Sequence, residues 1–135
     1  MATLRSPFRY DFVGSFLRPQ AIKTARADFK AGEITREQLT AVENEQITLL
    51  IEKQKRAGYH AITDGKFRRS YWHLDFMWGF AGTDEIELDH GYYFQGEETT
   101  HGSIRDSGKI SGENHPFVEH YKFVKQFEDE DCIAR

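Results

Sequence analysis

The sequence has one cysteine and no long hydrophobic run, and each scarcity excludes a class of protein. A single thiol, Cys132, cannot form an internal disulfide or supply a cysteine-rich zinc site, which is typical of a reducing compartment. No apolar run approaches the roughly 20 residues of a membrane helix, and the N-terminus has no signal-peptide pattern. We therefore expect a cytoplasmic protein with no membrane segment.

An excess of basic charge is also absent. The chain has 18 basic and 22 acidic side chains and a net charge of −4, so no basic surplus would release counterions from a nucleic acid. With 39% hydrophobic and 30% charged residues over 135 positions, the composition is that of a soluble globular domain. We expect one compact domain that does not bind nucleic acid.

Two helices are predicted between residues 19 and 58. Pro19 suits a first helical turn, and Gly32 suits the residue that follows a helix. Residues Thr35 to Gln38 form a capping box that begins a longer helix, which Gly58 ends. On this longer helix, one broad face contains Leu39, Val42, Ile47, Leu50 and Ile51, and the other faces contain Glu37, Glu43, Glu45, Lys53 and Lys55.

A β-prone segment lies on each side of this helix pair. The segments Phe8–Val13 and Tyr59–Thr63 would be parallel strands, since the two helices form the crossover between them. The first strand ends at Gly14 and Ser15, and the second ends at Asp64. A further strand is predicted to open at Cys132–Arg135.

The middle of the chain has a different pattern. After Asp75, glycines separate short β-prone pieces, which predicts a β-hairpin excursion that ends near Gly112. His115 and Pro116 then fit the start of another helix. We expect a single incomplete α/β domain with the first βα units in residues 1–75, the hairpin in 76–113, and a helix with the next strand in 114–135.

Ligands of parallel α/β sheets bind outside the carboxyl ends of the strands. The segment after the second predicted strand is the richest in reactive side chains. There Lys66, Arg68 and Arg69 could bind a carboxylate, phosphate or sulfonate, Trp72 could stack on a flat ring, and Asp64 could hold an amine. The alternative interpretations are a solvated arginine pair, a tryptophan anchor, and a structural histidine at His73.

The candidate metal ligands are not organised by spacing. None of the six histidines stands in an HExxH motif or a paired Cys/His pattern. Cys132 fits a small buried residue better than a nucleophile, because no basic side chain is adjacent to it in the sequence. We expect no metal to be bound by this chain alone.

The segments Val13–Pro19 and Ile62–Phe76 resemble the cobalamin-independent methionine synthase family, in particular its shorter, single-barrel members. The resemblance runs along nearly the whole chain and covers about the first third of such a protein. It implies the N-terminal portion of a (β/α)8 TIM barrel. It also implies an enzyme that uses a zinc-bound thiolate of homocysteine to take a methyl group from a methylated folate. The family's zinc ligands would lie beyond Arg135, so no metal ligand or catalytic residue is assigned on this chain.

The resemblance also assigns the amino-acid end of the substrate site. Gly14 and Ser15 match a turn that cradles the substrate carboxylate, and Asp64 matches the aspartate of the family's Asp-Gly pair. The family continues with a glutamate that contacts the substrate amino group, and here that position is Lys66. Because a lysine would repel an ammonium, either Lys66 turns away, Asp64 takes over the contact, or the substrate is a different thiol, such as an anionic one. The candidate substrate-binding residues are Gly14, Ser15, Asp64, Lys66, Arg69, Trp72 and His73.

Three functions follow from these patterns. The first is a fragment of a zinc-dependent methyltransferase, inactive by itself. The second is a transferase that acts on a different thiol. The third is a non-catalytic α/β binding or assembly module, in which exposed sheet edges would favour a homo-oligomer.

Overall fold

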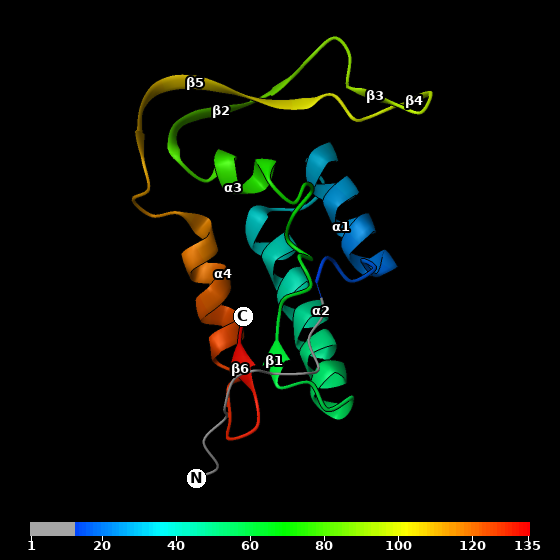
Figure 1. Cartoon of the computed structure of the whole chain (residues 1–135), viewed down its shortest axis with the longest axis vertical. Coiled ribbons are helices and arrows are strands. Elements are labelled where there is room, and N and C mark those ends of the chain that lie inside the picture. Colours follow the sequence, from blue (N-terminus) through cyan, green and yellow to red (C-terminus); the bar gives the residue numbers. More distant parts are fainter. Residues whose placement is uncertain (1–12) are drawn as a thin grey trace. The chain divides into compact units, whose positions relative to one another are not determined.

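The structure is a computed structural model that describes residues 13–135. The predicted strand Phe8–Val13 lies outside the described residues except for Val13, which is in no strand. The chain is a mixed α/β protein, as predicted, and it divides into two compact units (Figure 1). The first unit contains the residues up to Arg68 together with His120–Arg135, and the second contains Arg69–Glu119.

Helix α1 (Gln20–Ala31) begins and ends where the sequence predicts. Pro19 is its N-cap residue, and Gly32 ends it in the left-handed conformation with a φ of 79°. Ile22 and Ala25 are buried, so the apolar side of the helix faces the interior of the first unit.

Helix α2 (Arg36–Arg56) starts at the predicted capping box. The Gln38 backbone amide donates to the Thr35 hydroxyl at 3.3 Å, and the Thr35 backbone amide donates to the side-chain oxygen of Gln38 at 2.8 Å. Two polar side chains of α2, those of Glu43 and Gln54, lie among the buried residues. The prediction that Glu43 lies on a polar face is therefore wrong. Its carboxylate can be buried because it forms an ion pair with Arg68.

The two parallel strands of the first unit come from distant parts of the sequence. Strand β1 (Ala61–Ile62) pairs with β6 (Ile133–Ala134), and the two lie side by side in Figure 1, in green and red. The Ile133 amide donates to the His60 carbonyl at 2.8 Å. Both strands are predicted from the sequence, and the observed parallel partner of β1 is the last strand of the chain.

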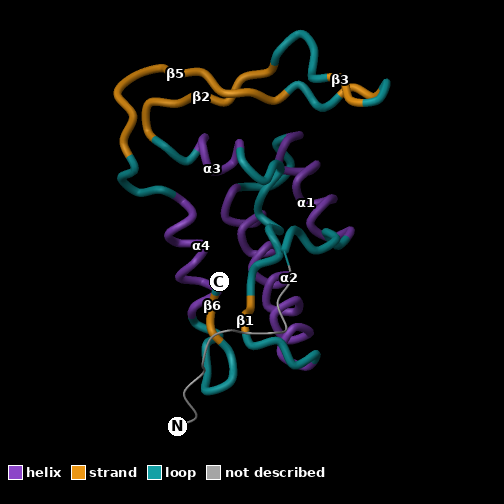
Figure 2. Tube along the Cα trace, in the orientation of Figure 1, coloured by secondary structure: helices purple, strands orange, loops and turns teal. Residues whose placement is uncertain are grey.

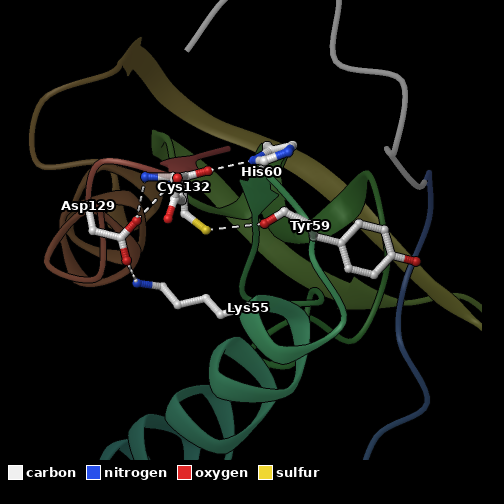
Figure 3. Close-up of polar contacts among 6 residues, drawn as sticks. Lys55, Tyr59, His60, Asp129 and Cys132 are labelled. Carbon is white, nitrogen blue, oxygen red and sulfur yellow. Dashed lines mark hydrogen bonds and ion pairs between the residues drawn. The ribbon is translucent and has the colours of Figure 1, made fainter. Parts of the chain in front are cut away.

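Cys132 is tied down immediately before β6 (Figure 3). Its thiol donates to the Tyr59 carbonyl at 3.1 Å, and its amide donates to the Asp129 carboxylate at 2.9 Å. Asp129 also forms an ion pair with Lys55 near the end of α2. Burial, followed by the charge of Asp129, raises the pKa of the Cys132 thiol. This confirms the interpretation of Cys132 as a small buried residue.

The hydrophobic core of the first unit lies between its helices and β1. Helix α4 (Pro116–Lys125) contributes Val124, and the segment after β1 contributes Phe67. The core cluster consists of Ile22, Ile47, Leu50, Ile51, Ile62, Phe67, Val124 and Cys132. Removal of these side chains from water is the main stabilising contribution in this unit.

The second unit contains the predicted hairpin (Figure 2). Strand β2 (Ala81–Glu87) pairs antiparallel with β5 (Gly102–Ser111), with an irregular register between Ala81 and Thr83. The short strands β3 (Tyr93–Phe94) and β4 (Glu97–Glu98) pair near its tip. Among residues 13–135, no helix is long and apolar enough to cross a membrane.

Helix α3 (Leu74–Trp78) and the start of α4 meet at His115 in the second unit. The Phe117 amide donates to Nδ1 of His115 at 3.1 Å, and Nε2 donates to the Phe76 carbonyl at 2.8 Å. These two bonds require the proton on Nε2. The prediction that His115 sits at a helix entry is confirmed.

Candidate functional site

The segment after β1 forms a tight turn that satisfies its own backbone groups. The Gly65 amide donates to the Thr63 hydroxyl at 2.9 Å, and the Lys66 amide donates to Oδ1 of Asp64 at 2.8 Å. The Phe67 amide closes the turn onto the Asp64 carbonyl at 3.2 Å. Gly65 and Lys66 both have left-handed backbones, with φ of 65° and 58°. The Asp64 side chain therefore shapes the turn before any ligand is bound.

Only glycine fits at position 65. A Cβ atom there would lie 2.5 Å from Cδ2 of Leu50 and 3.2 Å from the Phe16 ring. The positive φ of Gly65 adds strain for any other residue. The turn thus packs directly onto the core side of α2.

The structure brings the two predicted substrate-binding segments together. The Phe16 amide, next to Ser15, donates to the Gly65 carbonyl at 3.2 Å. Arg18 donates to the Lys66 carbonyl at 3.1 Å. Gly14 adopts a positive φ of 106°, and Ser15 is exposed. Four of the seven candidate residues, Gly14, Ser15, Asp64 and Lys66, therefore lie on two adjoining turns.

Two polar side chains that were not predicted as site residues hold the turn in place. Gln54, which is 2% exposed, donates to the Thr63 carbonyl at 2.8 Å and accepts from the Thr63 amide at 3.0 Å. Arg26 donates to the Phe67 carbonyl at 2.8 Å. In the sequence, Gln54 falls on the apolar face of α2. A polar residue in such a position indicates a buried side chain that forms hydrogen bonds.

Arg68 does not belong to a solvated pair, so that alternative is wrong for this residue. Its side chain is 6% exposed and forms a 3.1 Å ion pair with Glu43, whose side chain is 9% exposed. It also donates to the Asn44 side chain at 2.5 Å and lies 5.2 Å from the centre of the Phe123 ring. Burial raises the pKa of Glu43, and the charge of Arg68 partly opposes that rise.

Lys66 has a different environment from Arg68. Asp64 and Arg18 fix its backbone, as described above, whereas no carboxylate in the part of the chain that the structure describes forms an ion pair with its ammonium. The turn therefore presents one cation whose charge is not neutralised by a direct contact.

The other three candidates belong to the second unit. Arg69 lies over the Phe117 ring at 4.1 Å and donates to the Trp72 carbonyl at 3.5 Å. Trp72 is 72% exposed, so it is not a core anchor. His73 stands before α3 with its ring 4.5 Å from that of Trp72, and its Nδ1 is buried without a hydrogen-bond partner. All three side chains therefore lie outside the unit that contains the two turns.

Residues 13–135 contain no group of three or more His, Cys, Asp or Glu side chains that could hold a metal ion. The described part of the chain thus does not fit a zinc centre of the usual composition.

Comparison with known proteins defines the class to which this fold and these turns belong. Residues 10–89 match the family described as the catalytic domain of cobalamin-independent synthase. This range includes both the Gly14-Ser15 and the Asp64-Lys66 turns. The chain therefore belongs to the cobalamin-independent synthase family, which confirms the predicted resemblance.

Individual relatives extend the likeness beyond that range. The chain is 43% identical over 122 residues to YxjH and 41% identical over 120 residues to YxjG, two uncharacterised proteins of Bacillus subtilis (strain 168). These matches cover 90% and 89% of the chain but 32% of each relative. A candidate vitamin-B12 independent methionine synthase from Listeria monocytogenes superposes with a TM-score of 0.75 and 38% identity, over 98% of this chain and 36% of that one. The chain thus spans about a third of the length of these proteins.

Proposed function

We propose that this chain is the N-terminal portion of a (β/α)8 barrel that transfers a methyl group from a methylated folate to the thiol of homocysteine. Membership of the synthase family supports a role in methyl transfer. The parallel pairing of β1 with β6 across a helical crossover is the arrangement that a barrel repeats. About 250 residues are typical of a complete barrel, so this chain by itself would be inactive.

The observation that carries the proposal is the 3.2 Å hydrogen bond between the Phe16 amide and the Gly65 carbonyl. It joins the Gly14-Ser15 turn to the Asp64-Lys66 turn, although some 50 residues separate them in the sequence. The two turns meet beyond the end of β1, and ligands of parallel sheets bind at such strand ends. We assign the substrate carboxylate to Gly14 and Ser15, and the amino group to Asp64.

The roles of these residues are binding and orientation. Asp64 uses Oδ1 to hold the turn, and its carboxylate charge would attract the substrate ammonium. Zinc, when bound by the full-length protein, would activate the thiol. This chain's part is to fix the amino-acid end of the substrate so that the thiol reaches the reaction centre.

A chimera tests this assignment. The chain would replace the matching third of YxjH, and methyl transfer from a methylated folate to homocysteine would be measured with zinc present, beside the 135-residue chain alone and unaltered YxjH. We expect transfer by the chimera and none by the chain alone. We also expect Asp64→Asn to raise the KM for homocysteine about tenfold or more. A folded chimera that transfers no methyl group under conditions where YxjH does would refute the proposal.

The uncompensated charge of Lys66 favours a second candidate, transfer to a thiol that bears an anionic group in place of an ammonium. The turn fixes the backbone of this lysine, and its charge would repel an ammonium and attract a carboxylate or sulfonate. In the chimera, Lys66→Glu would shift the kcat/KM ratio from mercaptoethanesulfonate toward homocysteine. The control is Lys23→Glu, the same charge reversal at an exposed position of α1. An unchanged thiol preference in Lys66→Glu would eliminate this candidate.

The third function, a non-catalytic binding or assembly module, stays a prediction. It requires the chain to associate through its sheet edges. Sedimentation of the 135-residue chain, together with the chimera assay, separates it from the methyltransferase functions, because only the module would form a stable homo-oligomer and show no transfer.

A further inference from the structure

The ion pair of Arg68 and Glu43 is the most deeply buried pair of charges in the described residues, and neither proposed substrate role uses it. A buried ion pair contributes little net stability, because removing two charges from water costs about as much as their attraction returns. The pair is therefore better explained by a geometric role. Arg68 follows the Asp64-Lys66 turn closely in the sequence, which indicates that the pair sets the conformation of this turn.

The segment from Thr63 to Arg68 is attached to helix α2 at both ends. Gln54 binds Thr63 through two hydrogen bonds, and Glu43 binds Arg68. The two attachment points on α2 are eleven residues apart, a rise of about 16 Å along the helix. Five residue steps could span about 17 Å only if fully extended. The turn closed by Phe67 shortens the segment, so the long side chain of Arg68 must cover the remainder.

The contacts of Arg68 use the fork of the guanidinium and not only its charge. Nη1 binds Glu43 and Nη2 binds Asn44, which are neighbours on α2. Phe123 of α4 lies against the same guanidinium. A lysine ammonium is a compact charge on a flexible stem and cannot reproduce this planar arrangement.

We propose that Arg68 is a positioning residue, which through Glu43 and Asn44 sets the conformation of the Asp64-Lys66 turn. Its relevance to catalysis rests on the proposed function, because that function assigns substrate contacts to the turn. The positioning itself can be tested without substrate.

Amide hydrogen exchange in the 135-residue chain provides the test. The Lys66 amide reports the turn, since it donates to Asp64, and the Ile47 amide reports the core of the same unit. Exchange at both positions would be compared with global stability in Arg68→Lys and in the double variant Glu43→Met/Arg68→Met. Lys55→Met serves as the matched control, because it removes the more exposed ion pair with Asp129 from the same unit.

In Arg68→Lys, we expect exchange at Lys66 to accelerate about tenfold relative to Ile47. In the double variant, apolar side chains of similar volume would restore stability, while the Lys66 amide would remain fast. Lys55→Met would leave the ratio unchanged. If exchange at Lys66 follows global stability in every variant, Arg68 only stabilises the fold and the proposal is wrong. Should the double variant fail to fold, the ratio in Arg68→Lys decides the question alone.

Discussion

The two units of the chain are stabilised in different ways. In the first unit, fully buried aliphatic side chains such as Ile22, Ile47 and Ile62 form a hydrophobic core. In the second unit, large aromatic side chains are exposed near the hairpin tip, where Tyr93 and Phe94 are 68% and 67% exposed. The Asp64-Lys66 turn rests on the first kind of support, and the hairpin does not.

Strand pairing and aromatic contacts hold the second unit together instead. The strands β2 and β5 pair along the hairpin, and the Trp78 indole donates to the Ser103 carbonyl at 3.0 Å. His115 lies about 5 Å from the rings of three phenylalanines, Phe76, Phe80 and Phe117. This difference means that substitutions in the core of the first unit should affect stability most, and substitutions at the hairpin tip least.

The largest effect is expected from Ile47→Ala, which would leave a cavity at a fully buried position. Such truncations cost about 2 to 5 kcal/mol of unfolding free energy. The matched truncation Tyr93→Ala, at the exposed hairpin tip, should change it by about 0.5 kcal/mol or less. Urea denaturation followed by circular dichroism measures both. Equal losses would contradict the contrast between the units.

A smaller contrast is expected between two glycines with positive φ. In Gly65→Ala, backbone strain adds to a clash with Leu50 and Phe16, so we expect a loss of about 2 to 3 kcal/mol. In Gly96→Ala, at the hairpin, no atom lies within 4 Å of the new Cβ, and only the strain of about 1 kcal/mol remains. The same denaturation experiment compares the two. A loss in Gly96→Ala as large as that in Gly65→Ala would mean that the Asp64-Lys66 turn is not packed tightly onto α2.

The sequence predicts those elements whose signals are local. The capping box at Thr35, the glycine at position 32 and the proline at the first position of α4 each specify a helix boundary within a few residues, and all three boundaries are confirmed. The pairing of β1 with β6 was harder to predict, because a two-residue strand carries no information about which distant strand lies beside it.

The two turns were predicted in part for the same reason. The turn-forming residues Gly14, Asp64 and Gly65 are recognisable from their type, and the structure shows them on adjoining turns. The place of Gln54 on the apolar face of α2 indicates its burial, whereas the burial of Arg68 could not be predicted, because it depends on packing against Glu43, 25 residues away in the sequence. Arginine side chains are usually exposed, which favours the interpretation of Arg68 as part of a solvated pair. In the structure Arg68 is instead buried against Glu43.

The two units should also differ in how stability depends on pH. Glu43 faces Arg68, Arg26 and Arg36, and its pKa is nevertheless raised above 4.5, because burial has the largest effect. The folded state therefore binds this proton more tightly than the unfolded state. The resulting contribution to stability is complete below pH 4.5 and is lost as the pH rises through the folded-state pKa. The stability difference between the wild type and Glu43→Gln should accordingly decrease as the pH rises.

Asp84 on the hairpin should show the opposite sign. Hydrogen bonds from Arg105 and then Ser107 lower its pKa below 3.8, so the folded state favours the carboxylate. Its contribution is present above pH 3.8 and is lost as the pH falls through the depressed folded-state pKa. Since this pair is solvent-exposed, the effect should be small and should weaken with added salt. Urea unfolding of Asp84→Asn and Glu43→Gln over the same pH series measures both slopes. Slopes of the same sign would show that burial does not distinguish the two carboxylates.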